Sequence, residues 1–315
     1  MTAITDIAYV IFNHTDLDAA HRFYTDFGLQ VVARRTDELV LRAASGHPYC
    51  YIARRAQRPG LVAIGLCAPN RQALEQAALF PEASAIEKLE RQGGGECVRL
   101  TSPDGWVFEL THGVELPQRQ TLRPALKLNN GDTKTRYGEW QRAEPGPTPV
   151  WRLGHVALLT PDFKRSAAWL QSRLGLRPSD LLYDGSPDDQ VGGFFHAGAG
   201  DWVDHHTIAL FPGDTARVHH TSFEVQDLDA QFLGNKWLRE QRWQGLWGVG
   251  RHILGSQIFD YWFDPDANVV EHFTDGDLVT PGQPPGRHQV TGEALAQWGP
   301  PIDLAYFVNP WRQPD

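Results

Sequence analysis

Three side chains in the C-terminal half of the chain are of the types that ligate a divalent metal ion. His155 lies in the apolar run "GHVALLT", His220 lies in "VHHTSFEV" and Glu271 lies in "DYWFDPDANVVEHF". All three runs are typical of β-strands, in which alternate side chains share one face. Strands of one module that curve around a common cup would bring two imidazoles and one carboxylate together. This set leaves up to three coordination positions open and suits Fe(II) or a similar divalent ion, so it predicts one metal site.

The segment around Glu271 repeats a segment far upstream. The stretches "DYWFDPDANVVEHFTDG" (residues 260–276) and "VRLTSPDGWVFELTHG" (residues 98–113) both predict a strand, a Pro-Asp turn and a second strand. In each, a glutamate follows the proline by six residues: Glu271 in the later copy and Glu109 in the earlier one. A repeat of this kind indicates two similar structural units.

A second repeat supplies the helices. The stretches "AYVIFNHTDLDAAHRFYTDFGL" and "GHVALLTPDFKRSAAWLQSRLGL" each predict an apolar strand, an amphipathic helix and a closing Gly-Leu. In the second copy we expect Thr160 to cap the helix and Gly175 to end it in the left-handed conformation. Further strand and strand–helix patterns follow in both halves. Together they predict an α+β fold of two modules, each built of two βαβββ repeats that curl into a barrel-like sheet.

The repeats also predict the domain organisation. We expect an N-terminal module over residues 1–115, a polar linker over residues 116–149 and a C-terminal module over residues 150–280. A Pro/Gly-rich tail covers residues 281–315. Its "DLAYFVNPW" segment carries enough apolar surface to dock on a neighbouring molecule or on its own module.

The chemistry is expected where the two modules differ. When the helices are aligned, Tyr9 stands where the second module has His155. The run "LVAIGL" has no histidine where the second module has "VHHTSFEV". The glutamate alone is kept in both modules. We therefore expect no metal site in the N-terminal module, and we interpret Glu109 as a structural carboxylate.

Composition limits the classes of partner. The chain has 315 residues and a formal charge of -9 without a basic stripe, so small molecules are favoured and a nucleic-acid partner is not expected. No apolar run approaches the length of a membrane span, and the N-terminus lacks the pattern of a signal peptide. Three cysteines without a disulfide or zinc pattern favour a reducing, cytoplasmic location.

One stretch of the second module carries the motif of a known family. It runs from "GRH" at residues 250–252 through Tyr261 and Asp264-Pro265 to Glu271. Together with the two-module pattern of essentially the whole chain, this stretch resembles the type I extradiol dioxygenases of the vicinal oxygen chelate superfamily. Those enzymes open catechol rings beside the diol. In that family the stretch holds a histidine beside the metal site, a tyrosine and a metal-ligating glutamate.

The resemblance implies a complete active site. It implies Fe(II), with Mn(II) as the alternative, and a set of groups that handle the substrate and its protons. The implied metal ligands are His155, His220 and Glu271, the implied acid/base is His206, and the residues implied to contact the substrate hydroxyl are His252 and Tyr261.

The implied reaction is extradiol cleavage of an aromatic ring by O₂. The substrate would be a substituted catechol or a trihydroxylated ring, such as a trihydroxytoluene, and the resemblance implies a homo-oligomer. A catechol chelates through two adjacent oxygens, and the charge of the metal lowers the pKa of the first hydroxyl. Two alternatives stay open: another metal-dependent enzyme of the superfamily (a 2-oxo-acid oxygenase, isomerase or lyase), or a metal-free binding module.

Some residues are expected to lie outside this chemistry. We predict a structural role for His219, because strand alternation turns it away from His220. His205 is separated from the neighbouring His206 mainly by the resemblance. Two departures from the family pattern, Asp260 before the tyrosine and Ala267 in the hairpin, are expected to bear more on substrate than on reaction. Five further histidines are predicted to lie on loops or solvent faces: His14, His47, His112, His196 and His272.

Overall fold

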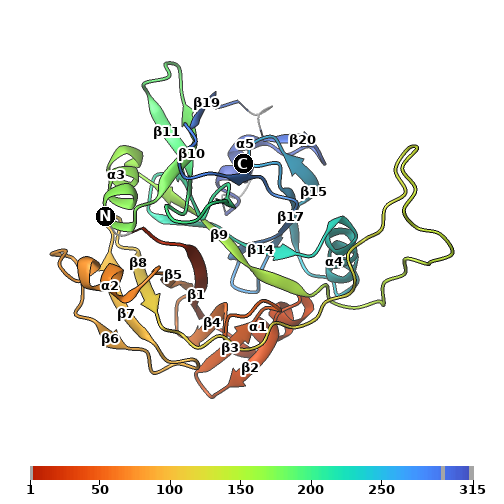
Figure 1. The fold of residues 1–315 in the computed structure, drawn as a ribbon, viewed down its shortest axis with the longest axis horizontal. Coiled ribbons are helices and arrows are strands. Elements are labelled where there is room, and N and C mark those ends of the chain that lie inside the picture. Colours follow the sequence, from red (N-terminus) through yellow and green to blue (C-terminus); the bar gives the residue numbers. More distant parts are fainter. Residues whose placement is uncertain (1–2, 292–294, 312–315) are drawn as a thin grey trace.

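Two β-sheets with helices beside them make up this computed structural model, which describes residues 3–291 and 295–311 (Figure 1). The first sheet has eight strands in the order β2-β3-β4-β1-β5-β8-β7-β6. They are β1 (Asp6–His14), β2 (Gln30–Arg34), β3 (Glu38–Arg42), β4 (Tyr51–Arg55), β5 (Gly60–Cys67), β6 (Glu87–Lys88), β7 (Glu96–Thr101) and β8 (Val107–His112), with helices α1 (Leu17–Asp26) and α2 (Arg71–Ala77).

The second sheet has ten strands in the order β19-β10-β11-β13-β9-β14-β17-β16-β15-β20. They are β9 (Val150–Thr160), β10 (Arg177–Tyr183), β11 (Gln190–His196), β13 (Ile208–Pro212), β14 (Arg217–Val225), β15 (Gly245–His252), β16 (Ile258–Phe263), β17 (Val269–Thr274), β19 (Gly286–Gln289) and β20 (Ala296–Trp298). The helices here are α3 (Phe163–Leu174), α4 (Leu228–Glu240) and α5 (Leu304–Val308), and β12 (Val203–Asp204) pairs with β18 (Leu278–Val279). The predicted class, α+β with two sheet modules, is confirmed.

The helix ends follow the sequence signals with one correction. Asp16 caps α1, since its side chain accepts hydrogen bonds from two backbone N–H groups of the first turn. The prediction that Thr160 caps α3 is wrong, because Thr160 is the last residue of β9 and the cap is Asp162. The Asp162 carboxylate accepts a hydrogen bond from the Arg165 N–H. Gly175 ends α3 at φ 65°, the left-handed conformation that was predicted.

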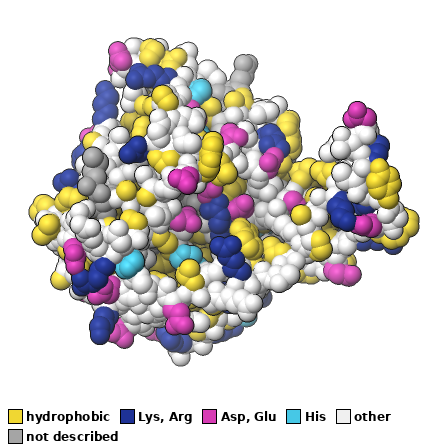
Figure 2. All heavy atoms as spheres, viewed as in Figure 1, with side chains coloured by type: hydrophobic (Ala, Val, Ile, Leu, Met, Phe, Trp, Pro, Cys, Tyr) yellow, Lys and Arg dark blue, Asp and Glu magenta, His cyan; other side chains and the backbone are white. Residues whose placement is uncertain are grey.

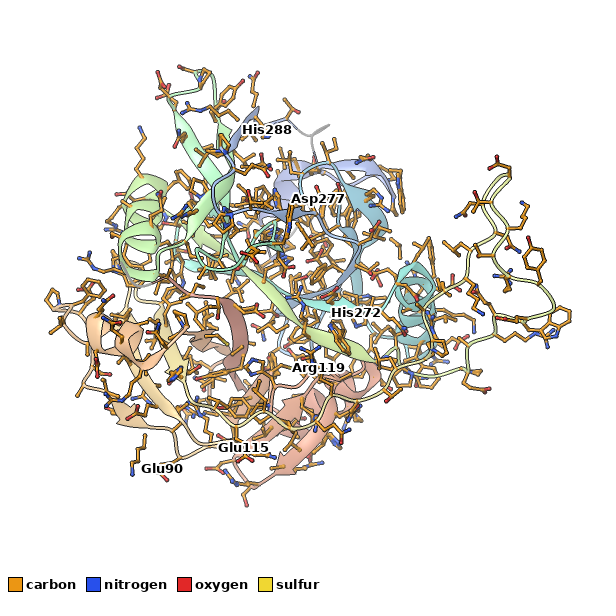
Figure 3. The ribbon with its side chains drawn as sticks, in the orientation of Figure 1. Glu90, Glu115, Arg119, His272, Asp277 and His288 are labelled. Carbon is orange, nitrogen blue, oxygen red and sulfur yellow. The ribbon has the colours of Figure 1, made fainter. Side chains whose placement is uncertain are left out.

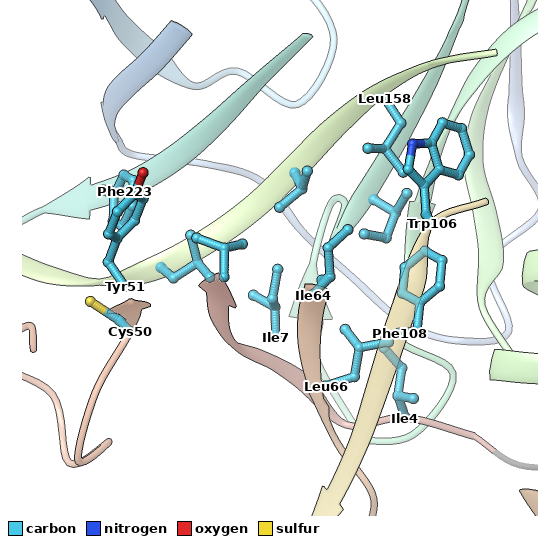
Figure 4. Close-up of a cluster of buried hydrophobic side chains, with 14 of the residues drawn as sticks. Ile4, Ile7, Cys50, Tyr51, Ile64, Leu66, Trp106, Phe108, Leu158 and Phe223 are labelled. Carbon is cyan, nitrogen blue, oxygen red and sulfur yellow. The ribbon is translucent and has the colours of Figure 1, made fainter. Parts of the chain in front are cut away.

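The two sheets share one buried core. A single cluster of buried apolar side chains draws on both sheets, and Figure 4 shows Ile64 and Phe108 of the first sheet and Leu158 of β9 within it. Burial of this much apolar surface stabilises the two modules as one packed body. The N-terminal module therefore braces the strands of the second sheet.

The C-terminal tail docks on its own module. β19 pairs in parallel with β10, and β20 pairs antiparallel with β15. Phe307 of α5 is buried, and its ring lies 5.0 Å from that of Trp247 and 5.3 Å from that of Tyr261. The tail thereby contributes to the wall around the predicted site.

The linker has a different character. Residues 116–149 run along the body and then extend away from it, at the right of Figures 1 and 2. Acidic and basic side chains are interspersed on the face shown in Figure 2. None of the described helices has the length and apolar character needed to cross a membrane.

Candidate metal centre and its cavity

Three adjacent strands of the second sheet carry His155, His220 and Glu271. Strands β9, β14 and β17 are neighbours, and Ser222 of β14 is in register with His155 on one side and with Glu271 on the other. His220 lies two residues before Ser222 and shares its face. His155 Nε2 lies 3.2 Å from both His220 Nε2 and Glu271 Oε2, and His220 Nε2 lies 3.5 Å from the same oxygen.

The spacing of these atoms fits one ion. Ligand atoms about 2.1 Å from a metal ion and at right angles to one another are about 3.0 Å apart. Glu271 is fully buried, and neither of its carboxylate oxygens has a hydrogen-bond partner among the described residues. A buried carboxylate without a partner is unfavourable. His155, His220 and Glu271 therefore form a donor set that a divalent cation would complete.

Electrostatics keep two of the three side chains in their ligating forms. Burial raises the pKa of Glu271, but the neighbouring His155 imidazole outweighs this effect, and the pKa lies below its ordinary value. Burial, together with the neighbouring His219, holds the pKa of His220 well below its ordinary value. At neutral pH Glu271 is then a carboxylate and His220 a neutral imidazole, the forms that bind metal ions.

The other three predicted site residues line the same cavity. It has a volume of about 760 Å³, and its lining includes His206, His252 and Tyr261 together with the ligands His155 and His220. The ring centroids of His206 and His155 are 4.0 Å apart. All six predicted side chains therefore meet in one place, although they come from segments more than a hundred residues apart in the chain.

The hydrogen bonds of His252 define its protonation. Its Nδ1 lies 2.8 Å from the backbone oxygen of Leu295, which can only accept, so Nδ1 carries the proton. Its Nε2 is then an acceptor for the hydroxyl of Tyr261 at 2.8 Å. Burial raises the pKa of Tyr261 well above its ordinary value, and the nearby Glu271 adds to the effect. Tyr261 is therefore a neutral phenol that donates a hydrogen bond.

Sequence reasoning missed a chain of polar groups behind His206. Its Nδ1 lies 3.1 Å from Nδ1 of His205, which was predicted to be merely structural. His205 Nε2 lies 2.7 Å from one carboxylate oxygen of Asp180, and His288 Nε2 lies 2.7 Å from the other. The adjacent histidine pair was the visible signal. Asp180 on β10 and His288 on β19 meet only because these distant strands pair.

His219 was predicted to be structural and to face away from His220, and the prediction of its orientation is wrong. The register of β14 against β9 shifts between Val218 and His220, so a bulge at His219 breaks the strand alternation. His219 consequently lines the cavity wall. Its Nδ1 lies 2.7 Å from Nδ1 of His220 and its Nε2 lies 2.7 Å from the backbone oxygen of Phe307, so it orients a predicted metal ligand.

Three of the five histidines predicted on loops or solvent faces are buried instead. His14 on β1, His196 on β11 and His272 on β17 are each at most 1% exposed. Each has an acceptor within reach of one ring nitrogen, which favours burial of an imidazole, although Nδ1 of His272 has no partner among the described residues. His272 is bonded across the module boundary: its Nε2 donates to the backbone oxygen of Phe27 at 2.7 Å.

The two departures from the family pattern are local. Asp260 is buried, and its carboxylate accepts hydrogen bonds from Trp262 Nε1 at 2.7 Å and Asn235 Nδ2 at 2.8 Å. Burial raises its pKa to about 7. Ala267 has φ 62°, a left-handed conformation that favours glycine.

Comparisons with known proteins agree with this architecture. Residues 152–272 match the family described as "Glyoxalase/Bleomycin resistance protein/Dioxygenase superfamily". This match lies within the second module and agrees with the superfamily that the sequence motif predicted. It is 28% identical over 309 residues to metapyrocatechase 2 of Cupriavidus necator, covering 98% of this chain and 92% of the relative.

Other relatives extend the comparison. The chain is 25% identical over 303 residues to a manganese-dependent 2,3-dihydroxybiphenyl 1,2-dioxygenase of Geobacillus genomosp. 3, covering 89% and 88% of the two chains. Homoprotocatechuate 2,3-dioxygenase of Brevibacterium fuscum has the same fold, with a TM-score of 0.80, 19% identity and coverage of 98% and 92%. So does a Mn(II)-bound glyoxalase of Novosphingobium aromaticivorans, with a TM-score of 0.79, 23% identity and coverage of 95% and 92%.

Proposed function

We propose that this chain is a metal-dependent extradiol dioxygenase that cleaves a catecholic ring beside its diol. One observation carries the proposal: two imidazoles and a carboxylate, spaced for one ion, adjoin a cavity that also contains His206, His252 and Tyr261. Relatives named metapyrocatechase and 2,3-dihydroxybiphenyl 1,2-dioxygenase align with most of the chain, which supports the same reaction.

The donor set suits Fe(II), and Mn(II) is the second candidate because one relative is named manganese-dependent. His155, His220 and Glu271 would hold the ion. When bound, it supplies positive charge that favours the deprotonated diol and electronic coupling that lets the ring react with O₂.

The remaining side chains orient the substrate and move protons. The Tyr261 hydroxyl and His252 Nε2 would contact the oxygens of the diol and set which oxygen keeps its proton. Burial, together with the neighbouring His155, holds the pKa of His206 well below its ordinary value. His206 is therefore a neutral imidazole that can accept a proton from the diol and return it during ring opening.

The cavity has room for a substituted ring. Its walls include Phe194, Phe211, Leu304 and Phe307, which exclude water from the reacting groups. An engineered cavity of about 150 Å³ in another protein binds benzene, so a volume of about 760 Å³ admits a ring together with its substituents. We propose a substituted catechol or a trihydroxylated ring, such as a trihydroxytoluene, as the substrate, and a homo-oligomeric assembly as in the family it resembles.

Anaerobic reconstitution tests this proposal. The purified protein would be loaded with Fe(II) or Mn(II) and given a panel of catechols and trihydroxybenzenes. O₂ would then be admitted while its uptake and the visible absorbance of a ring-opened product are followed. We expect stoichiometric uptake and a conjugated semialdehyde-type product. Uptake without ring opening would favour another oxygenase of the superfamily, and failure to bind metal would favour a binding module.

A further inference from the structure

We propose that Asp180 and His205 are positioning residues that fix the tautomer of His206, so that the lone pair of its Nε2 faces the cavity. The inference rests on the proposed acid/base role of His206. It is carried by the unbroken chain of contacts from Asp180 Oδ2 to His205 Nε2 at 2.7 Å and from His205 Nδ1 to His206 Nδ1 at 3.1 Å.

The carboxylate of Asp180 sets the direction of the hydrogen bonds that lead to His206. Each oxygen of Asp180 lies 2.7 Å from an imidazole Nε2, one from His205 and the other from His288. Burial raises the pKa of Asp180, but hydrogen bonds from the two imidazoles outweigh it, and the pKa lies below its ordinary value. An ionised carboxylate only accepts hydrogen bonds, so His205 must donate from Nε2.

The remaining assignments follow. A neutral His205 that carries its proton on Nε2 has only a lone pair on Nδ1, so His206 must donate from its own Nδ1. A neutral His206 then has its lone pair on Nε2. His206 lines the cavity, and no hydrogen bond from the described residues reaches this nitrogen. The atom that must take the proton from the diol is therefore left available.

Packing holds the two rings in place. His205 and His206 are each 4% exposed. The ring of Phe194 lies 5.4 Å from that of His205 and 5.0 Å from that of His206. Gly255 lies against His205 so closely that a Cβ there would be 2.9 Å from His205 Nδ1. The imidazoles cannot rotate freely, which preserves the direction of the hydrogen bonds.

The arrangement also favours the protonated product of the transfer. When Nε2 of His206 takes the proton of a diol O–H, the positive charge on its ring is stabilised through the His205 hydrogen bond and the Asp180 carboxylate. The same logic operates in hydrolytic triads, in which a buried carboxylate orients a catalytic histidine without taking the proton itself. The diol oxygen keeps the electron pair, so the transfer is balanced.

The substitution Asp180→Asn tests the inference because it keeps the shape of the side chain. The new amide can donate to His205 Nε2, which reverses the chain and places a proton on Nε2 of His206. We expect kcat to fall by roughly 10²–10⁴, while KM and metal content stay unchanged. Asp180→Glu, which keeps the carboxylate, should restore part of the activity. An unchanged kcat in Asp180→Asn would overturn the inference.

The tautomer of His206 can also be measured directly, without enzymatic turnover. In protein loaded with diamagnetic Zn(II), the ¹⁵N shifts of the His206 ring should show a proton on Nδ1 in the wild type and on Nε2 in Asp180→Asn. A proton on Nε2 in the wild type would contradict the proposal. If the wild type binds metal but cleaves no catechol, the proposed function fails while this measurement still decides the tautomer.

His288 provides the matched control. His288→Asn removes the other partner of Asp180 and loosens the pairing of β19 with β10, but it leaves the bond from His205 intact. We expect a much smaller loss of kcat in this variant than in Asp180→Asn, because the carboxylate keeps its hydrogen bond from His205. An equal loss in His288→Asn and Asp180→Asn would show that strand pairing, and not the orientation of His206, determines the rate.

Discussion

The two modules place different groups at equivalent positions of similar sheets. In the second sheet, Ser222 is in register with His155 and with Glu271. In the first sheet, Gly65 is in register with Tyr9 on one side and Glu109 on the other. Tyr9 thus replaces a predicted metal ligand, and the two glutamates correspond.

In the first module, arginine side chains supply the positive charge beside the glutamate. Arg91 Nη1 lies 2.7 Å from Glu109 Oε2, and Arg99 Nε lies 3.0 Å from Glu109 Oε1. The hydroxyl of Tyr9 donates to Glu109 Oε2 at 2.6 Å. Glu109 is thereby fully paired, whereas neither oxygen of Glu271 has a hydrogen-bond partner among the described residues. Two guanidinium groups complete the first site, and the second is open to an ion that can also bind substrate.

The largest difference between the modules should appear when each glutamate is removed. We expect Glu271→Ala to lose metal and activity together, by more than the roughly 10–100-fold caused by changing an outer partner of a metal site. Glu109→Ala should keep both. Metal content by mass spectrometry and O₂ uptake would be measured on both variants. Metal retained in Glu271→Ala with full turnover would end the assignment of the site.

Removal of the Arg91 guanidinium should lower the stability of the protein without changing its metal affinity. Arg91→Met leaves Glu109 buried with part of its charge unpaired, because only Arg99 and Tyr9 remain. Because Arg99 still pairs with Glu109, the loss of unfolding free energy should be smaller than the roughly 3–5 kcal/mol expected when a buried charge is left without any partner. Denaturant unfolding would measure the loss, and the metal affinity of the folded protein should be unchanged. A fall in metal affinity equal to that of Glu271→Ala would mean that the two sites are not independent.

The modules should also differ in pH dependence. The cross-strand pair next to each glutamate is Val98 and Leu110 in the first module and Asp260 and His272 in the second. Burial raises the pKa of Asp260 from 3.8 to about 7. Asp260 ionises at a lower pH in the unfolded chain than in the folded protein, so its contribution to stability is complete below about pH 4 and is lost as the pH rises towards 7, by up to about 4 kcal/mol.

Asp260→Asn checks this pH effect. The amide does not ionise, so the part of the stability loss due to Asp260 between pH 4 and pH 8 should disappear, whatever constant cost the new amide brings. Urea unfolding at a series of pH values would show the change of slope. Parallel stability curves for wild type and variant would show that Asp260 does not titrate in this range.

The smallest effect is expected where the first module braces the second. His272 adjoins Glu271 on β17, near the boundary between the sheets in Figure 3. Its ring stacks on that of Phe27 at 3.7 Å and donates to the Phe27 backbone oxygen. His272→Phe should cost about 1–3 kcal/mol of stability and weaken metal binding by about tenfold. Manganese titration would measure this, with His272→Gln as the control that keeps a donor.

The predicted ligands were accessible from sequence because the signals are local. Each of His155, His220 and Glu271 lies in a strand-like run, and comparison of the two repeats shows that the histidines occur only in the second module. The prediction for His219 failed because a single bulge cancels the alternation that it assumed. Nothing local reports that Asp180 would meet His288, because that contact depends on pairing between a strand and the C-terminal tail.

The contact of Arg91 with Glu109 could not be predicted from the sequence for a similar reason. The run "RQGGGE" reads only as a turn, and its three glycines do adopt positive φ. The functional group of that turn is Arg91, whose side chain reaches a glutamate on β8. Its role depends on a partner 18 residues away and on the absence of histidines in β5, neither of which is written into the turn itself.

We propose that the second module binds a divalent ion and that the first does not. Crystals of the protein grown with Mn(II), with anomalous data collected near the manganese edge, test it most directly. We expect one strong peak among His155 Nε2, His220 Nε2 and the Glu271 carboxylate, and no peak at Glu109. A peak at Glu109, or no peak between the two imidazoles, would contradict it.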